Sequence, residues 1–191
     1  MGLWRAFVLR LLDVVFAGLG LLVLWPVLLV LCALAWFDTR SPLFRQERLG
    51  RYERPFVLVK LRTMRLGTAS VASHLASSSA ITPLGALLRR TKLDELPQLW
   101  NVLLGDMSLV GPRPGLLNQH ELTSARAAHG VFAFRPGITG LAQVNGIDMS
   151  TPELLAQTDA TMLRQLGVRS YFLFIALTVL GKGSGDAAIK K

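Results

Sequence analysis

Residues 14–37, VVFAGLGLLVLWPVLLVLCALAWF, contain no charged side chain and decide how this chain folds and where it resides. A straight helix of this length would reach about 36 Å, which exceeds the roughly 30 Å of hydrocarbon in a bilayer. We therefore expect this segment to enter a membrane as a helix. The single cysteine, Cys32, lies inside the run, so a disulfide framework is excluded.

Pro26 stands in the middle of this run and predicts an interruption of the helix. Its missing N–H frees the carbonyl of Leu22, and its ring favours a kink. Arginines flank both ends of the run, so the positive-inside rule gives a spanning helix no orientation. Two interpretations stay open: a re-entrant helix–break–helix with both ends on the cytoplasmic face, or a kinked spanning helix. Arg10 and Asp13 are spaced to pair on one helix face.

The composition is both apolar and basic, with 51% hydrophobic residues and a formal net charge of +9. This combination indicates a protein seated in a membrane that faces anionic lipid or an anionic substrate. A nucleic-acid binder is also basic, but it predicts aromatic platforms or a recognised fold, and neither is visible. We therefore expect no nucleic-acid partner.

The remaining sequence divides into a domain over 39–180 and a flexible tail over 181–191, after the membrane segment 1–38. The short strands and more numerous helices predicted in this domain indicate a mostly helical α/β fold. Residues 67–80 are small and polar, which predicts a mobile loop. Short strands are expected at 44–49, 56–61 and 107–110, with a turn near Gly50. Helices are expected at 83–90, 93–104, 116–128, from 152 onward, and at 170–180. Thr82 is the expected N-cap of the first of them. The last is expected to be an amphipathic helix on the surface.

The stretch 87–114, LLRRTKLDELPQLWNVLLGDMSLVGPRP, holds the adjacent carboxylates Asp94 and Glu95. Adjacent helical residues point about 100° apart, so the pair cannot share one proton but can perform two tasks at one site. Pro97 requires Asp94 to lie in or near a first helical turn, where the dipole and nearby cations favour an ionised nucleophile or metal ligand. The alternative is structural, since Thr91 and Asp94 also match a capping box.

Several basic residues in rigid segments suit the recognition of phosphate. Arg113 lies between two prolines, and Arg135 precedes a proline and a glycine. Lys60 and Arg62 alternate at the end of a predicted strand, so they should face the same side. For each residue the alternative is a solvated surface charge, but several rigid cations near an acidic pair favour phosphate chemistry.

These segments resemble the bacterial monotopic phosphoglycosyl transferases, a family of bacterial sugar transferases, and in particular its small single-domain members. The resemblance runs from about Arg10 to Leu180 and includes SPLFRQERLG, KLRTM, TPLGALLRRTKLDELPQLWNVLLGDMSLVGPRP and RPGITGLAQVNG. It implies a cytoplasm-facing α/β domain on a re-entrant helix broken at Pro26, in the bacterial inner membrane.

In this family the aspartate of the Asp-Glu pair, here Asp94, attacks the β-phosphate of a UDP-sugar and releases UMP. Polyprenyl (undecaprenyl) phosphate then takes the sugar phosphate from the enzyme, as the first membrane step of O-antigen, capsule or glycoprotein glycan assembly. The resemblance implies Mg²⁺ near Asp94 and Glu95, phosphate contacts from Arg89, Arg113 and Arg135, and contact with membrane lipids. The small members point to an N-acetylated deoxysugar, and a homo-oligomer stays open.

One residue departs from the family pattern. Many relatives have serine before the break proline, where this chain has Trp25, whose indole cannot accept hydrogen bonds from the backbone. The alternative function is a non-catalytic basic membrane scaffold for a glycan-assembly complex. That alternative explains the charge and the hydropathy, but it leaves the acidic pair among arginine-bearing loops unexplained.

Overall fold

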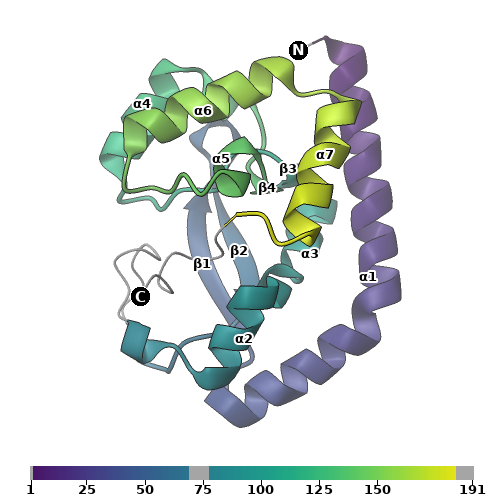
Figure 1. Cartoon of the computed structure of the whole chain (residues 1–191), viewed down its shortest axis with the longest axis vertical. Coiled ribbons are helices and arrows are strands. Elements are labelled where there is room, and N and C mark those ends of the chain that lie inside the picture. The colour runs from purple at the N-terminus through teal and green to yellow at the C-terminus, as the bar shows by residue number, and fades with distance from the viewer. Residues whose placement is uncertain (1, 69–77, 184–191) are drawn as a thin grey trace.

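The computed structural model describes residues 2–68 and 78–183, and helices dominate it (Figure 1). A long helix, α1, runs along one side of the molecule, and the remaining elements pack against one face of it (Figure 1). The elements are α1 (Leu3–Thr39), β1 (Leu43–Leu49), β2 (Pro55–Leu61), α2 (Pro83–Thr91), α3 (Gln98–Leu104), β3 (Ser108–Val110), α4 (His120–Ala128), β4 (Gly137–Thr139), α5 (Leu141–Val144), α6 (Pro152–Gln165) and α7 (Val168–Val179).

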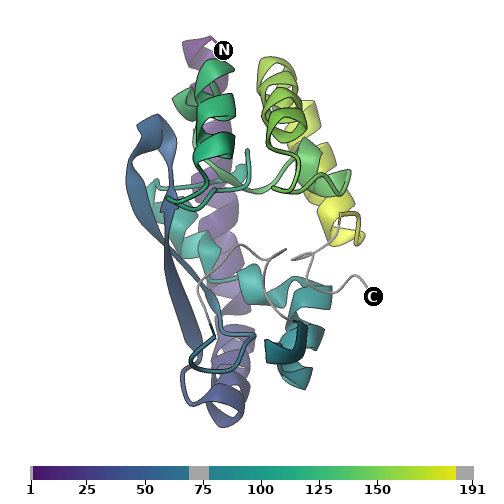
Figure 2. The same ribbon diagram turned by 90° about the vertical axis from the view of Figure 1, so that its left-hand side faces the viewer.

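Strands β1 and β2 form an antiparallel hairpin with Leu49 opposite Pro55 and Leu43 opposite Leu61. The predicted pair of strands and the turn near Gly50 are therefore confirmed. Figure 2 shows this hairpin to one side of α1 and helices α6 and α7 to the other. The hairpin thus forms one wall of the domain, and the C-terminal helices form the opposite wall.

The second sheet is a short parallel pair, β3 with β4. The strand expected at 107–110 is confirmed as β3, whereas β4 lies in a segment where the sequence predicts no strand. Gly137 makes this pairing possible, because a Cβ there would lie 2.0 Å from the backbone nitrogen of Gly111. No side chain can occupy that space, so glycine allows the two backbones to approach.

We expect Gly137→Ala to lower the free energy of unfolding by about 1–3 kcal/mol, because the added methyl must push two backbone segments apart. Gly115→Ala is the matched control, since a Cβ there would make only ordinary contacts with side-chain atoms, at 3.5 Å or more. Unfolding of both variants in detergent micelles measures the difference. Equal stability of the two variants would contradict the close approach.

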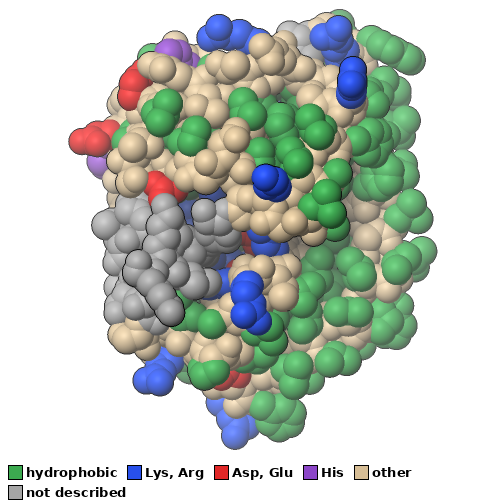
Figure 3. Space-filling view, in the orientation of Figure 1, with side chains coloured by type: hydrophobic (Ala, Val, Ile, Leu, Met, Phe, Trp, Pro, Cys, Tyr) green, Lys and Arg blue, Asp and Glu red, His purple; other side chains and the backbone are tan. Residues whose placement is uncertain are grey.

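Helix α1 packs on the domain through two stretches, residues 9–17 and 31–39. Its buried positions recur at intervals of four within each half of the helix: Leu9, Asp13, Ala17, Leu31, Ala35 and Thr39. The opposite face exposes large apolar side chains from Leu3 to Phe37, and these form the hydrophobic edge at the right of Figure 3. By length and composition, α1 is the helix in the described residues that could cross a membrane.

The expected break at Pro26 takes the form of a bend. The helix continues from Leu3 to Thr39 with Pro26 inside it, and it curves over its second half (Figure 1). A proline removes one hydrogen bond and crowds the preceding turn, which bends a helix without necessarily ending it. Trp25 is 56% exposed and therefore points away from the domain.

Arg10 and Asp13 attach the first half of α1 to the domain. Arg10 donates to three carbonyls at the end of α3 and just beyond it, with Nη1 2.8 Å from the carbonyl oxygen of Val102. Asp13 Oδ1 accepts from Ser108 Oγ at 3.0 Å, and from the Leu109 N–H and the Tyr171 hydroxyl. Arg10 and Asp13 also pair as predicted, at 3.9 Å. One buried carboxylate thus connects α1, β3 and α7.

The helix boundaries differ from the prediction at two places. The helix expected at 93–104 is a 3₁₀ turn over Leu93–Glu95 followed by α3, because Pro97 lies at the N-cap and separates them. Helix α4 begins at His120, after the Gln119 side chain accepts a hydrogen bond from the Leu116 N–H and holds a turn there. The cap at Thr82 is confirmed, with Oγ1 accepting from the Gly85 N–H.

Helix α7 buries Tyr171 and Phe174, and it exposes large apolar side chains together with Arg169. One of them, Phe172, meets Phe16 of α1 edge to face, with ring centroids 5.6 Å apart. The exposed surfaces of α7 and α1 are therefore one continuous apolar surface. Most of the predicted mobile loop (residues 69–77) and most of the predicted tail (184–191) lie outside the described residues.

Candidate active site

The acidic pair lies in the 3₁₀ turn between α2 and α3. Lys92 closes α2 in the left-handed conformation, with φ of 58°, and so turns the chain into this segment. Asp94 is 3% exposed, whereas Glu95 stays partly open. Burial of a charge is costly, so a carboxylate at this depth needs cations or hydrogen-bond donors around it.

The capping-box alternative for Asp94 does not hold. Thr91 lies in the last turn of α2, where its hydroxyl donates to the carbonyl of Leu87 at 2.9 Å. The 3₁₀ turn has Lys92 at its N-cap and no side-chain cap. Thr91 is therefore not a helix start, and a capping role does not explain the burial of Asp94.

Arg113 is brought to the acidic pair by the proline-rich turn after β3. Its Nη2 lies 3.1 Å from Glu95 Oε1, which is the geometry of an ion pair. Both side chains are part-exposed, so a diphosphate could approach the same guanidinium. The predicted association of Arg113 with the pair is confirmed.

A buried ion pair that the sequence reasoning missed supports the Arg113 turn. Arg126 of α4 donates through Nη1 to the Arg113 carbonyl at 2.8 Å. Its Nε and Nη2 both donate to Asp159 Oδ2 of α6, at 3.0 and 2.7 Å. Burial raises the pKa of Asp159, while the adjacent guanidinium opposes that shift. The two residues are 33 positions apart, and no local pattern marks either of them.

Arg89 and Lys60 are both buried beside the 3₁₀ turn. Arg89, 3% exposed, donates from Nε to Thr63 Oγ1 at 2.8 Å. Lys60, 9% exposed, lies with its ammonium over the ring of Phe44, and its strand β2 packs on the turn. Such burial of two cations next to a buried carboxylate agrees with a site for anions.

Arg62 faces the same side as Lys60, as predicted, because both cations lie over Phe44. However, Arg62 donates to the carbonyls of Ser41 and Leu43, so it holds the start of β1. These contacts give it a structural role in the hairpin.

Arg135 is not brought to the acidic pair, which corrects the sequence prediction. Its Nε donates to the Gly105 carbonyl at the far end of α3, at 2.7 Å. Burial lowers its pKa, and the charged neighbours that act on it include Arg10 and Arg51. The rigid loop that holds this guanidinium therefore binds the C-terminus of a helix, where cations are favoured.

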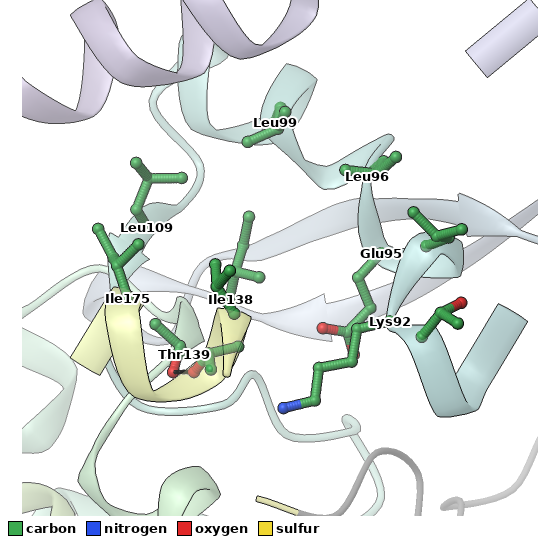
Figure 4. Close-up of a pocket in the computed structure, with 12 residues that line it drawn as sticks. Lys92, Glu95, Leu96, Leu99, Leu109, Ile138, Thr139 and Ile175 are labelled. Carbon is green, nitrogen blue, oxygen red and sulfur yellow. Dashed lines mark hydrogen bonds between the residues drawn. The ribbon is translucent and has the colours of Figure 1, made fainter. Parts of the chain in front are cut away.

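A cavity of about 310 Å³ opens beside Glu95 (Figure 4), and we call it the α7 pocket. Lys92 borders it and donates to the carbonyl of Lys182 at 2.7 Å. Burial lowers the pKa of Lys92, whereas the nearby Glu95 raises it. The hydroxyls of Thr139 and Thr178, two residues of the pocket lining, form a hydrogen bond with each other. It is lined by Thr91, Lys92, Leu93, Glu95, Leu96, Leu99, Leu109, Ile138, Thr139, Ile175, Thr178 and Val179.

Asp94 and Glu95 are the adjacent carboxylates that could hold the expected magnesium ion. In residues 2–68 and 78–183 no cluster of three or more potential metal ligands occurs. Magnesium is commonly held by one or two carboxylates together with substrate phosphates and water. Two adjacent carboxylates fit that kind of site.

Comparison with known proteins matches residues 4–182 to the family described as bacterial sugar transferases, and the chain belongs to this family. Two relatives are named UDP-glucose:undecaprenyl-phosphate glucose-1-phosphate transferase. The one from Caulobacter vibrioides is 46% identical over 157 residues, covering 78% of this chain and 58% of the relative. The one from Xanthomonas campestris pv. campestris is 40% identical over 149 residues, covering 74% and 31%.

A third relative, the exopolysaccharide production protein PSS of Rhizobium leguminosarum bv. phaseoli, is 41% identical over 150 residues, which cover 72% of this chain and 74% of the relative. The chain thus matches 58% and 31% of the lengths of the first two relatives, but most of the third. The shared region contains the acidic pair and its supporting arginines, since the family match runs almost from end to end.

Proposed function

We propose that this protein transfers a sugar 1-phosphate from a UDP-sugar to undecaprenyl phosphate at the cytoplasmic face of the bacterial inner membrane. The buried Asp94, beside the Glu95–Arg113 pair, is the observation that carries the proposal. The names of the two glucose-1-phosphate transferases describe the same type of reaction. A scaffold without catalysis would explain the charge and the apolar surface, but it would not explain a partly open Glu95–Arg113 pair beside a pocket.

The reaction is expected in two steps. First, a carboxylate oxygen of Asp94 attacks the β-phosphorus of the UDP-sugar. The bond from that phosphorus to the bridging oxygen breaks, and UMP leaves with the oxygen. Second, an oxygen of the lipid phosphate attacks the same phosphorus, the aspartyl–phosphorus bond breaks, and the lipid diphosphate sugar is released. A covalent intermediate divides one difficult transfer into two easier ones.

The remaining residues position the diphosphate and offset its charge. Arg113 is held by its backbone and by Glu95, so its guanidinium is preorganised for phosphate oxygens. Arg89 and Lys60 place two further positive charges near the turn. A magnesium ion bound by Asp94, Glu95 and the diphosphate would neutralise charge on the leaving UMP.

We infer that α1 is re-entrant, with both ends on the cytoplasmic side. A helix of 37 residues is about 55 Å long, and the domain is attached near both of its ends. Near the first end, Asp13 bonds to Ser108 and Tyr171. At the second end, Thr82 Oγ1 donates to Asp38 Oδ2 at 2.6 Å. A helix that crossed the bilayer would pull part of this polar domain into the hydrocarbon.

The topology is tested by single cysteines at Gly2 and Arg40 in a Cys32→Ser background. We expect a membrane-impermeant maleimide added to intact cells to label neither position, and to label both after permeabilisation. A cysteine introduced into a known periplasmic loop of another protein is the positive control. Labelling of either position in intact cells would contradict re-entry.

The reaction is tested with UDP-glucose, UDP-galactose and UDP-linked N-acetylated deoxysugars, each supplied with undecaprenyl phosphate and Mg²⁺. We expect UMP from at least one of these donors, because the bond between the two phosphates breaks. Release of UDP would mean ordinary glycosyl transfer and would overturn the mechanism. Binding to anionic liposomes with no nucleotide product from any donor would favour the scaffold.

A further inference from the structure

The α7 pocket lies between the 3₁₀ turn of the acidic pair and helix α7, and the proposed donor chemistry does not use it. We propose that this pocket binds the first isoprene units of the prenyl phosphate acceptor, with the phosphate at its Lys92 end. This inference rests on the proposed function, since it assigns a place to the second substrate of that reaction.

The lining of the pocket fits an amphiphile with one charged end. Aliphatic side chains from α3, β3, β4 and α7 form the walls, and they include Leu99, Ile138 and Ile175 (Figure 4). A nucleoside would leave its polar edges unpaired against such walls. A branched hydrocarbon gains free energy there, because its surface leaves water or detergent.

Charge is concentrated at one side of the pocket. Lys92 carries three donors on its ammonium group, of which one is given to the Lys182 carbonyl. Glu95 borders the pocket and is adjacent in the chain to Asp94. A lipid phosphate held by Lys92 would therefore lie beside Glu95, the chain neighbour of the carboxylate that is proposed to carry the sugar phosphate. The second step needs this approach.

The pocket is open toward the apolar surface of the protein. Leu99 forms part of its wall and also contacts α1, since a Cβ on Gly20 would lie 3.1 Å from Leu99 Cδ1. At the rim, Val179 is 81% exposed. A cavity of 310 Å³ is at the lower end of the roughly 300–1,000 Å³ of ligand sites, so it suits the first units of a long chain.

The test uses geranyl phosphate with a photoreactive diazirine on its terminal isoprene unit, and the full chain in detergent micelles. Val179→Trp places a large ring at the rim of the pocket. Leu180→Trp is the matched control, because Leu180 is adjacent, 79% exposed and not part of the lining. We expect Val179→Trp to reduce photolabelling about tenfold and Leu180→Trp to leave it unchanged. Peptide mapping should place the wild-type label on the lining of the pocket.

A second variant tests the charged end. Lys92→Met should weaken labelling by geranyl phosphate about tenfold, while labelling by the uncharged geraniol probe stays the same. Equal loss with both probes would mean that the variant only disturbs the wall, and would overturn the phosphate assignment. Equal displacement of the probe by phosphatidylglycerol would overturn the choice of a prenyl phosphate over an ordinary lipid.

The photolabelling measurements need no UDP-sugar, so their outcome does not depend on the proposed reaction. If UMP is released but Val179→Trp labels like the wild type, the pocket assignment is wrong and the reaction stands. If Val179→Trp instead raises the KM for the UDP-sugar and leaves the KM for undecaprenyl phosphate unchanged, the pocket holds the donor and the inference is wrong.

Discussion

Replacement of Asp94 by asparagine is expected to lower turnover at least about 10⁴-fold, as loss of a covalent nucleophile does in other enzymes. Asparagine keeps the shape of the side chain but cannot form the phosphosugar ester. The fold should survive, because the residue lies in a short turn between two helices with its neighbours unchanged. UMP release and thermal unfolding, measured on the same preparation, separate the two effects.

Glu121→Gln is the control for a lost carboxylate. Glu121 is exposed on α4 and lies outside the acidic pair, so its neutralisation should leave turnover within about twofold. If Asp94→Asn turned over at the wild-type rate, Asp94 would not be the nucleophile. If it failed to fold, the test would move to Asp94→Glu, which keeps the charge but displaces it and should also lose activity.

The second large effect concerns the buried ion pair behind the active site. Arg126→Met is expected to lower the free energy of unfolding by about 3–5 kcal/mol, because Asp159 would be left charged and buried. The same change removes the hydrogen bond to the Arg113 carbonyl. Arg126 is therefore a positioning residue, and the KM for the UDP-sugar should rise in whatever fraction still folds.

A double variant separates these two roles. Arg126→Met with Asp159→Leu removes both charges, so most of the stability should return. The turn that carries Arg113 would still lack its hydrogen bond, and the raised KM should persist. Recovery of both properties would show that Arg126 acts on the fold alone. Failure to recover stability would contradict the buried-charge explanation.

Those parts of the fold that depend on local chemistry were predictable from sequence. The hairpin β1–β2 follows from two alternating segments around Gly50, and the start of α2 follows from Thr82 and the proline after it. The burial of α1 was not predictable, because its residues are almost uniformly apolar. Only packing decides that Ala17 and Ala35 face the domain while Trp25 faces outward.

The candidate site was predictable only where local chemistry fixes the backbone. Asp94, Glu95 and Arg113 lie in segments whose prolines fix the backbone, so their association could be expected. Arg135 has the same local signal, but tertiary packing places it at the other end of α3. Arg126 and Asp159 resemble ordinary polar residues of surface helices, and only the pairing of α4 with α6 buries them.

The most direct test of the account is mass spectrometry of the protein after incubation with the UDP-sugar panel and Mg²⁺, in the absence of any lipid phosphate. We predict that one donor adds the mass of a sugar phosphate to the peptide that contains Asp94. Addition of undecaprenyl phosphate should then remove it. A protein that turns over with lipid phosphate yet never carries the adduct, or carries it on Glu95, would contradict the proposed mechanism.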